Sequence, residues 1–188
     1  MNNKDFDVDI QPILRRIAAG DRQTFADVVR QYQRPLFGFL GRMGLNQSDA
    51  EEIAQETFLR AWMNLGRYKP DIAEFSTWLF TIARNLAWHE LSRASARRKW
   101  MTSEVLPEVP SERPQPPEEL AITEQKRRLH EALLKLPLAE RSAMALAYIK
   151  GLELTAVARI EGCTTGAVKT RVHRARQRLR QLLEPYDG

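Results

Sequence analysis

Apolar residues recur at three- and four-residue intervals along most of this chain, which is the spacing of one face of an α-helix. The sequence shows no run of alternating apolar and polar residues, the pattern typical of a half-buried strand. We therefore predict an all-α fold. The expected helices are Ile10–Ala19, Thr24–Phe39, Asp49–Leu65, Ser76–Arg98, Glu118–Lys135, Leu138–Lys150, Leu152–Glu161 and Thr164–Leu183, with a loop at Gly66–Glu74.

The last expected helix carries an apolar stripe between two basic flanks. At about 100° per residue, the stripe consists of Val168, Val172, Ala175, Leu179 and Leu183. The flanks consist of Lys169, Arg171, Arg174, Arg176, Arg178 and Arg180, and the opposite face carries Thr170, His173 and Gln177. Basic flanks suit the two phosphate backbones of a major groove, and the polar face suits base edges. A solvated basic helix that binds no nucleic acid is the alternative.

The segment before this helix is typical of a helix-turn-helix unit. Gly162 stands where a helix end requires positive φ, and Thr164 or Thr165 offers a hydroxyl to cap the next helix. In such a unit the second helix reads DNA. Cys163 occupies an apolar position in the turn, and we expect it to belong to the core.

Composition changes sharply between Trp100 and Glu119, where five prolines stand among glutamates. Proline removes backbone donors and disfavours helix before it, so this segment cannot join a packed core. At ~3.1 Å per residue, an extended tether of this length reaches about 50 Å. The predicted domains are residues 1–99 and 118–188, joined by an acidic linker at 100–117. Composition alone favours a passive linker.

Charge is segregated along the chain, although the formal net charge is only +5. Basic residues gather in Arg84–Lys99 and Lys169–Arg180, and acidic ones in Asp49–Glu56 and Glu104–Glu119. The segregation indicates one anionic partner and one basic partner.

Nothing in the sequence indicates export or a membrane. The single cysteine excludes an intrachain disulfide. The first ten residues contain three aspartates and no apolar run, so they do not form a signal peptide. No run approaches the ~18 apolar residues of a membrane span. We expect a cytoplasmic protein without membrane insertion.

In the acidic helix that begins at Asp49, we expect Ala50, Ile53 and Ala54 to face the core. Glu52, Gln55 and Glu56 then form its polar face. Early carboxylates complement the helix dipole, which explains part of the acidity. Gln55 beside Glu56 also suits a partner helix that carries arginines.

The basic helix that follows combines aromatic residues with arginines. Trp78, Ile82 and Leu86, with Leu79 as a further candidate, are expected to face inward. The surface that remains offers stacking faces and cations, as single-stranded nucleic acid requires. Trp78 is interpreted as a core residue, whereas Trp88 is left open between core and surface.

Three strings, DAEEIAQETFLRAW, FSTWLFTIARN and GAVKTRVHRARQRLR, occur in this order and are divided by the acidic tether. Together they resemble the extracytoplasmic-function (ECF) group of bacterial sigma factors, the initiation subunits of RNA polymerase, from about Gly20 to Leu183. The resemblance implies a region 2 bundle followed by a region 4 helix-turn-helix domain. The tether would then lie in the RNA exit path, either as an RNA mimic or as a passive spacer.

The resemblance also implies roles for individual residues. The coiled coil of the core polymerase clamp would be bound by Glu52, Gln55, Glu56 and Phe58. The second domain would bind the polymerase flap. Single-stranded −10 DNA would be bound by Arg67, Tyr68, Lys69, Arg84, Asn85, Trp88, His89, Arg93 and Arg97. Duplex −35 DNA would be bound by Thr165, Lys169, Thr170, Arg171, His173, Arg174 and Arg176. An anti-sigma factor is implied as an inhibitory partner. Family members usually carry an acidic residue at the position of His89 and an aliphatic one at that of Glu161.

No enzyme, cofactor or metal site is expected. The three histidines are far apart in sequence, and neither a Cys-x-x-Cys motif nor a Gly-rich phosphate loop occurs. Two other classes remain: a stand-alone helix-turn-helix regulator with a helical sensor domain, and an adaptor whose basic faces bind protein. The regulator hypothesis leaves the acidic helix and the tether without a purpose.

Overall fold

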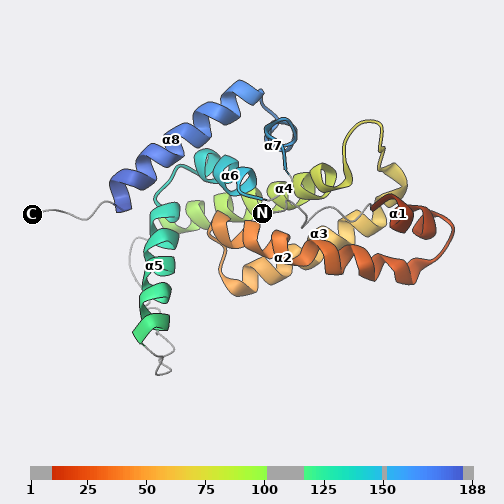
Figure 1. The fold of residues 1–188 in the computed structure, drawn as a ribbon, viewed down its shortest axis with the longest axis horizontal. Coiled ribbons are helices and arrows are strands. Elements are labelled where there is room, and N and C mark those ends of the chain that lie inside the picture. The colour runs from red at the N-terminus through yellow and green to blue at the C-terminus, as the bar shows by residue number, and fades with distance from the viewer. Residues whose placement is uncertain (1–9, 101–116, 150–151, 184–188) are drawn as a thin grey trace, which may run out of the picture.

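The structure, a computed structural model, describes residues 10–100, 117–149 and 152–183. Within these ranges the regular elements are eight α-helices and two short 3-10 turns, with no strand, so the all-α prediction is confirmed (Figure 1). The helices are α1 Ile10–Ala18, α2 Phe25–Met43, α3 Gln47–Met63, α4 Phe75–Trp100, α5 Pro117–Leu134, α6 Leu138–Ala147, α7 Leu154–Glu161 and α8 Thr165–Leu183. Residues 101–116, most of the predicted linker, lie outside the described residues.

The turn between α2 and α3 follows the capping chemistry of its residues. α2 runs through Pro35 and continues four residues beyond the expected end, until Gly44 terminates it at φ +91°. Asn46 then caps α3, because its side-chain oxygen accepts a hydrogen bond from the Asp49 N–H at 2.8 Å. The sequence Asn46-Gln47-Ser48 offers a cap for the helix expected from Asp49, whereas nothing in the sequence indicated the greater length of α2.

Helices α1 to α4 enclose the core of the first domain. Its largest fully buried side chains are Leu36, Leu40, Met43 and Phe39 from α2 and Phe75, Leu79 and Phe80 from α4. Ile53 and Ala54 of α3 complete it.

The buried face of α4 is rotated from the face that the sequence predicted. Leu79 is fully buried, whereas Trp78, Ile82 and Leu86 lie half-buried at the edge of the core. The cause is that α4 packs against α2 and α3 and also against α7 of the second domain. Ala83 and Ala87, both fully buried, allow these helices to approach closely.

Helices α5 to α8 form the second domain, which packs directly on the first. α6 lies between α8 and α2, and α7 lies beside α4 (Figure 1). The approach is close at Gly44, where an added Cβ would stand 2.3 Å from Leu134 Cδ2. The two domains therefore share one continuous set of buried apolar residues.

Replacement of Leu79 by alanine tests the observed face of α4. We expect Leu79→Ala to lower the free energy of unfolding by about 3 kcal/mol, because it leaves a cavity at a fully buried site. Leu59→Ala is the matched control and should cost less than ~0.5 kcal/mol, since Leu59 is 52% exposed. Urea denaturation measures both, and equal losses would contradict the observed packing.

Candidate nucleic-acid interfaces

The turn between α7 and α8 has the geometry of a helix-turn-helix unit. Gly162 adopts φ +63°, and the Cys163 N–H donates to the Ala158 carbonyl at 3.0 Å. Thr164 caps α8, because its Oγ1 accepts a hydrogen bond from the Ala167 N–H at 3.2 Å. The predicted turn and cap are confirmed, and Cys163 is half-buried against the core as expected.

The apolar stripe of α8 is buried over most of its length. Val168, Val172, Ala175 and Leu179 are buried, whereas Leu183, expected on the same stripe, is 41% exposed at the end of the helix. The far side of α8 is open to solvent and presents Lys169, Thr170, His173 and Arg174. Thr165 is half-buried at the start of the helix. In the described part of the chain, Lys169, His173 and Arg174 form no ion pair.

The two basic flanks of α8 are not equivalent. On one flank, Arg171 bonds to Glu161 at 2.9 Å and Arg178 Nε lies 3.1 Å from a carboxylate oxygen of Glu140. Arg176, on the other flank, lies over the ring of Tyr148, 5.8 Å from its centroid. Two arginines that the sequence assigned to phosphates are thus engaged by glutamates of α6 and α7.

Glu161 is the centre of a buried polar cluster that the sequence did not predict. Its side chain is fully buried. It accepts hydrogen bonds from Ser142 of α6 and Arg171 of α8, and from Arg84 of α4 at 3.5 Å. One signal was available: Glu161 is the last residue of α7, where the helix dipole disfavours negative charge, so a cationic partner was to be expected.

The first-domain loop presents basic residues around an inward-facing aromatic. Arg67 and Lys69 are exposed, whereas the ring of Tyr68 packs 5.4 Å from that of Phe75 and 5.3 Å from that of Trp78. Burial raises the pKa of the Tyr68 hydroxyl above its ordinary value. Ile72, which the sequence did not single out, is 64% exposed in the same loop.

Arg84, Asn85 and Trp88 form a contiguous group on α4. The guanidinium of Arg84 lies 4.3 Å from the centroid of the Trp88 ring and donates to Asn85 Oδ1 at 3.3 Å. Trp88 is half-buried and Asn85 exposed, so an amide and part of an aromatic side chain are accessible to solvent on the same group.

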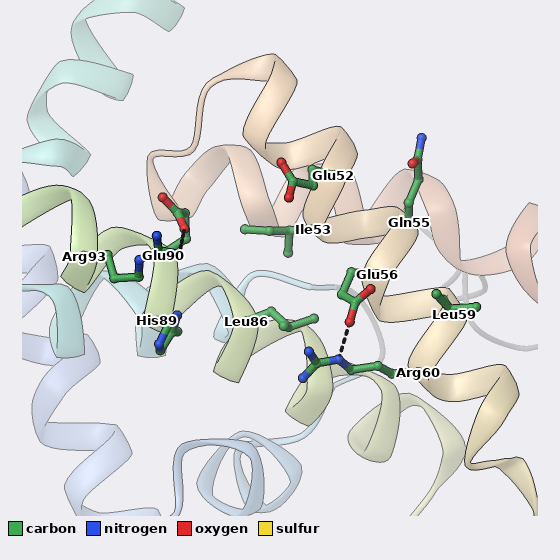
Figure 2. Close-up of a pocket in the computed structure, with 10 residues that line it drawn as sticks. All are labelled: Glu52, Ile53, Gln55, Glu56, Leu59, Arg60, Leu86, His89, Glu90 and Arg93. Carbon is green, nitrogen blue, oxygen red and sulfur yellow. Dashed lines mark hydrogen bonds and ion pairs between the residues drawn. The ribbon is translucent and has the colours of Figure 1, made fainter.

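A groove of about 500 Å³ runs between α3 and α4 (Figure 2). Its lining residues are Glu52, Ile53, Gln55, Glu56, Leu59, Arg60, Leu86, His89, Glu90 and Arg93. Glu56 is paired with Arg60 at 2.6 Å and Glu90 with Arg93 at 3.5 Å.

The groove brings together residues that the sequence assigned to different partners. His89 and Arg93, grouped with the −10 surface, line it opposite the acidic residues of α3. Phe58, grouped with the acidic residues, is half-buried and packs against the core. Arg97 lies on the last turn of α4, where side chains are outside the described residues.

Among the described residues, no three His, Cys, Asp or Glu side chains cluster closely enough to hold a metal ion. No helix in the described ranges has both the length and the apolar character to cross a membrane.

Family models match both halves of the chain. Residues 28–97 match sigma-70 region 2, and residues 126–179 match sigma-70 region 4. The first match covers α2 to α4 and the second covers the helix-turn-helix. The presence of both, in this order, favours the sigma factor hypothesis over a stand-alone regulator.

Whole-chain relatives agree with the family models. The ECF RNA polymerase sigma factor SigW of Bacillus subtilis is 31% identical over 93% of this chain and 96% of its own. The RNA polymerase sigma-H factor of Pseudomonas aeruginosa is 30% identical over 93% of this chain and 94% of its own. Among solved structures, the sigma factor RpoE of Bartonella quintana, bound to the anti-sigma factor NepR, is 27% identical, with a TM-score of 0.67. That match covers 86% of this chain and 98% of RpoE.

Proposed function

Since this chain belongs to the ECF group of RNA polymerase sigma factors, we propose that its exposed surfaces divide the work of promoter-specific transcription initiation. The observation that carries the proposal is the open face of α8, which the helix-turn-helix holds away from the core. The residues of this face act by binding alone, because a sigma factor favours melted promoter DNA and performs no covalent chemistry.

The second domain reads the duplex −35 element through α8. Thr170 and His173 contact the base edges. Lys169 and Arg174 lie beside them on the exposed face and contact phosphates or bases. Thr170 Oγ1 donates to the Gly166 carbonyl at 3.0 Å, so towards DNA its hydroxyl acts as an acceptor. Arg171 contacts DNA only after its hydrogen bond to Glu161 is broken, and Arg176 only after it moves off the ring of Tyr148.

The first domain holds melted −10 DNA. The loop around Arg67 and Lys69 receives an unstacked base and its phosphates, and Asn85 with Trp88 meets the upstream edge. Unstacking costs a few kcal/mol per base, and stacking contacts contribute ~1–3 kcal/mol each, so several must act together. Tyr68 supports this loop through its inward ring, and exposed Ile72 adds an apolar contact.

The groove between α3 and α4 is the docking surface for core polymerase. Glu52, Gln55 and Glu56 supply acceptors for arginines of a partner helix, and Leu59 supplies an exposed apolar contact. His89 and Arg93 line the opposite wall, where they limit which charges the groove accepts.

We also propose an anti-sigma factor as partner and the cytoplasm, where polymerase acts, as location. The support is the solved sigma–anti-sigma complex of a relative with 27% identity. The acidic groove and the second domain are the surfaces that such a partner would cover.

Run-off transcription with purified core polymerase and a random promoter library tests the function. We expect the chain to produce transcripts from a defined subset of sequences. The double variant Glu52→Ala/Glu56→Ala should weaken polymerase binding at least tenfold and reduce transcripts in parallel, because two charge-assisted contacts are lost.

Glu51→Ala is the matched control for this test. Glu51 is exposed on the same helix but lies outside the groove, and its contact is with Gln47. Wild-type chain that starts no transcripts would overturn the function. An equal loss of binding in the Glu51 control would overturn the groove as the docking site.

Single alanine variants of α8 separate base contacts from phosphate contacts. If Arg174 reads a base, Arg174→Ala should cost ~1–3 kcal/mol at one −35 position and relax the preference there. Lys169→Ala, which removes a phosphate contact, should weaken all promoters about equally. Sequencing of run-off products from the library gives both profiles.

Arg128→Ala serves as the charge-matched control, because Arg128 is an exposed residue of α5 in the same domain. We expect this variant to retain the wild-type promoter profile. If Arg174→Ala and Lys169→Ala both keep the wild-type promoter profile, the open face of α8 does not recognise the −35 element.

A further inference from the structure

The polar cluster around Glu161 joins the two domains. Glu161 and Arg171 belong to the second domain, whereas Arg84 belongs to the first, 77 positions away. The Glu161 side chain has no exposed surface, and the side chains of Arg84 and Arg171 are 18% and 31% exposed. A carboxylate in such a place is stable only while cationic partners or hydrogen-bond donors surround it.

Both arginines also belong to the proposed DNA surfaces, one in each domain. Arg84 adjoins Asn85 and Trp88 on the −10 side, and Arg171 lies on the −35 helix. In this conformation one carboxylate binds both. The two promoter elements lie about 25 base pairs apart, which is roughly 85 Å of B-form DNA at 3.4 Å per base pair. The closed chain therefore cannot engage both elements at once.

Other contacts hold the same junction together. Arg159 of α7 donates to the carbonyl of Ile72, in the proposed −10 loop, at 2.7 Å. Gly44, between α2 and α3, leaves room for the side chains of Leu134 and Arg141. The second domain thus lies against the DNA-facing loop of the first, and its docking keeps water from Glu161.

From this arrangement we propose that Glu161 is an autoinhibitory clasp: it holds the free chain closed and withholds Arg84 and Arg171 from promoter DNA. When the domains separate, Glu161 loses Arg84 and becomes hydrated. Its pair with Arg171 then becomes a solvent-exposed ion pair, which is weak, and Arg171 can turn to phosphate. The proposal rests on the proposed function for the role of the two arginines, but not for the closure itself.

The variant Glu161→Gln tests the clasp in the full-length chain. Glutamine keeps the size of the side chain and can still accept a hydrogen bond, but it removes the charge that both arginines need. We expect the radius of gyration from small-angle X-ray scattering to increase. The affinity for a short random-sequence DNA duplex, measured by fluorescence anisotropy at fixed salt, should rise about tenfold, equivalent to about 1.4 kcal/mol.

Glu140→Gln is the matched control. Glu140 is also a buried glutamate of the second domain, but its ion pair is with Arg178 of α8, inside that domain. The control makes the same change of charge but leaves every contact between the domains in place, so we expect an unchanged radius of gyration. An equal expansion of this control would overturn the proposal.

Circular dichroism establishes that each variant is folded. Should Glu161→Gln fail to fold, Arg84→Gln breaks the same contact from the first domain, and its radius of gyration alone decides the closure. A folded variant that stays compact overturns the clasp. Expansion without tighter DNA binding overturns the withholding of the arginines, while the sigma function is judged separately by run-off transcription.

Discussion

The closed arrangement of this chain depends on the neutralisation of one buried carboxylate. Glu161 ends α7 with a negative charge where the helix dipole opposes it, and no water reaches its side chain. Arg84, Arg171 and Ser142 compensate from three other helices. Since one of these partners comes from the first domain, the local stability of α7 is coupled to the contact between domains.

The basic residues of α8 accordingly fall into two groups: those that are free to bind DNA and those that glutamates of the same chain already bind. Lys169, His173 and Arg174 are exposed without ion pairs in the described chain, whereas Arg171 and Arg178 are bound to glutamates. The basic residues that the sequence places on both flanks of this helix therefore differ in the closed chain, because glutamates neutralise Arg171 and Arg178. We therefore expect the free chain to bind promoter DNA weakly without polymerase, because fewer phosphates can be neutralised.

Much of this architecture was predictable because its causes are local. The caps at Asn46 and Thr164 and the positive φ of Gly162 depend on neighbouring residues, and the buried positions of α3 and α8 follow helical spacing. The acidic residues of α3 were recognised by the same periodicity, and the structure places them along a groove.

The remaining features depend on contacts between distant segments. The buried face of α4 is rotated because a second domain packs on it, which the spacing of α4 itself cannot reveal. His89 and Arg93 line a groove with α3, and the spacing of α4 alone does not reveal this contact between two helices. The partners of Glu161 stand 10, 19 and 77 positions away, so sequence indicated a need for compensation but not its source.

The most direct test of this account is the distance between the domains in the free chain and in the promoter complex. Single-molecule energy transfer can report it between dyes at Ser48→Cys and Gln181→Cys, both exposed positions, in a Cys163→Ala background. The account predicts high transfer in the free chain and low transfer once core polymerase and promoter are added. Equal transfer in the two states would contradict it, since a chain that stays closed cannot reach both promoter elements.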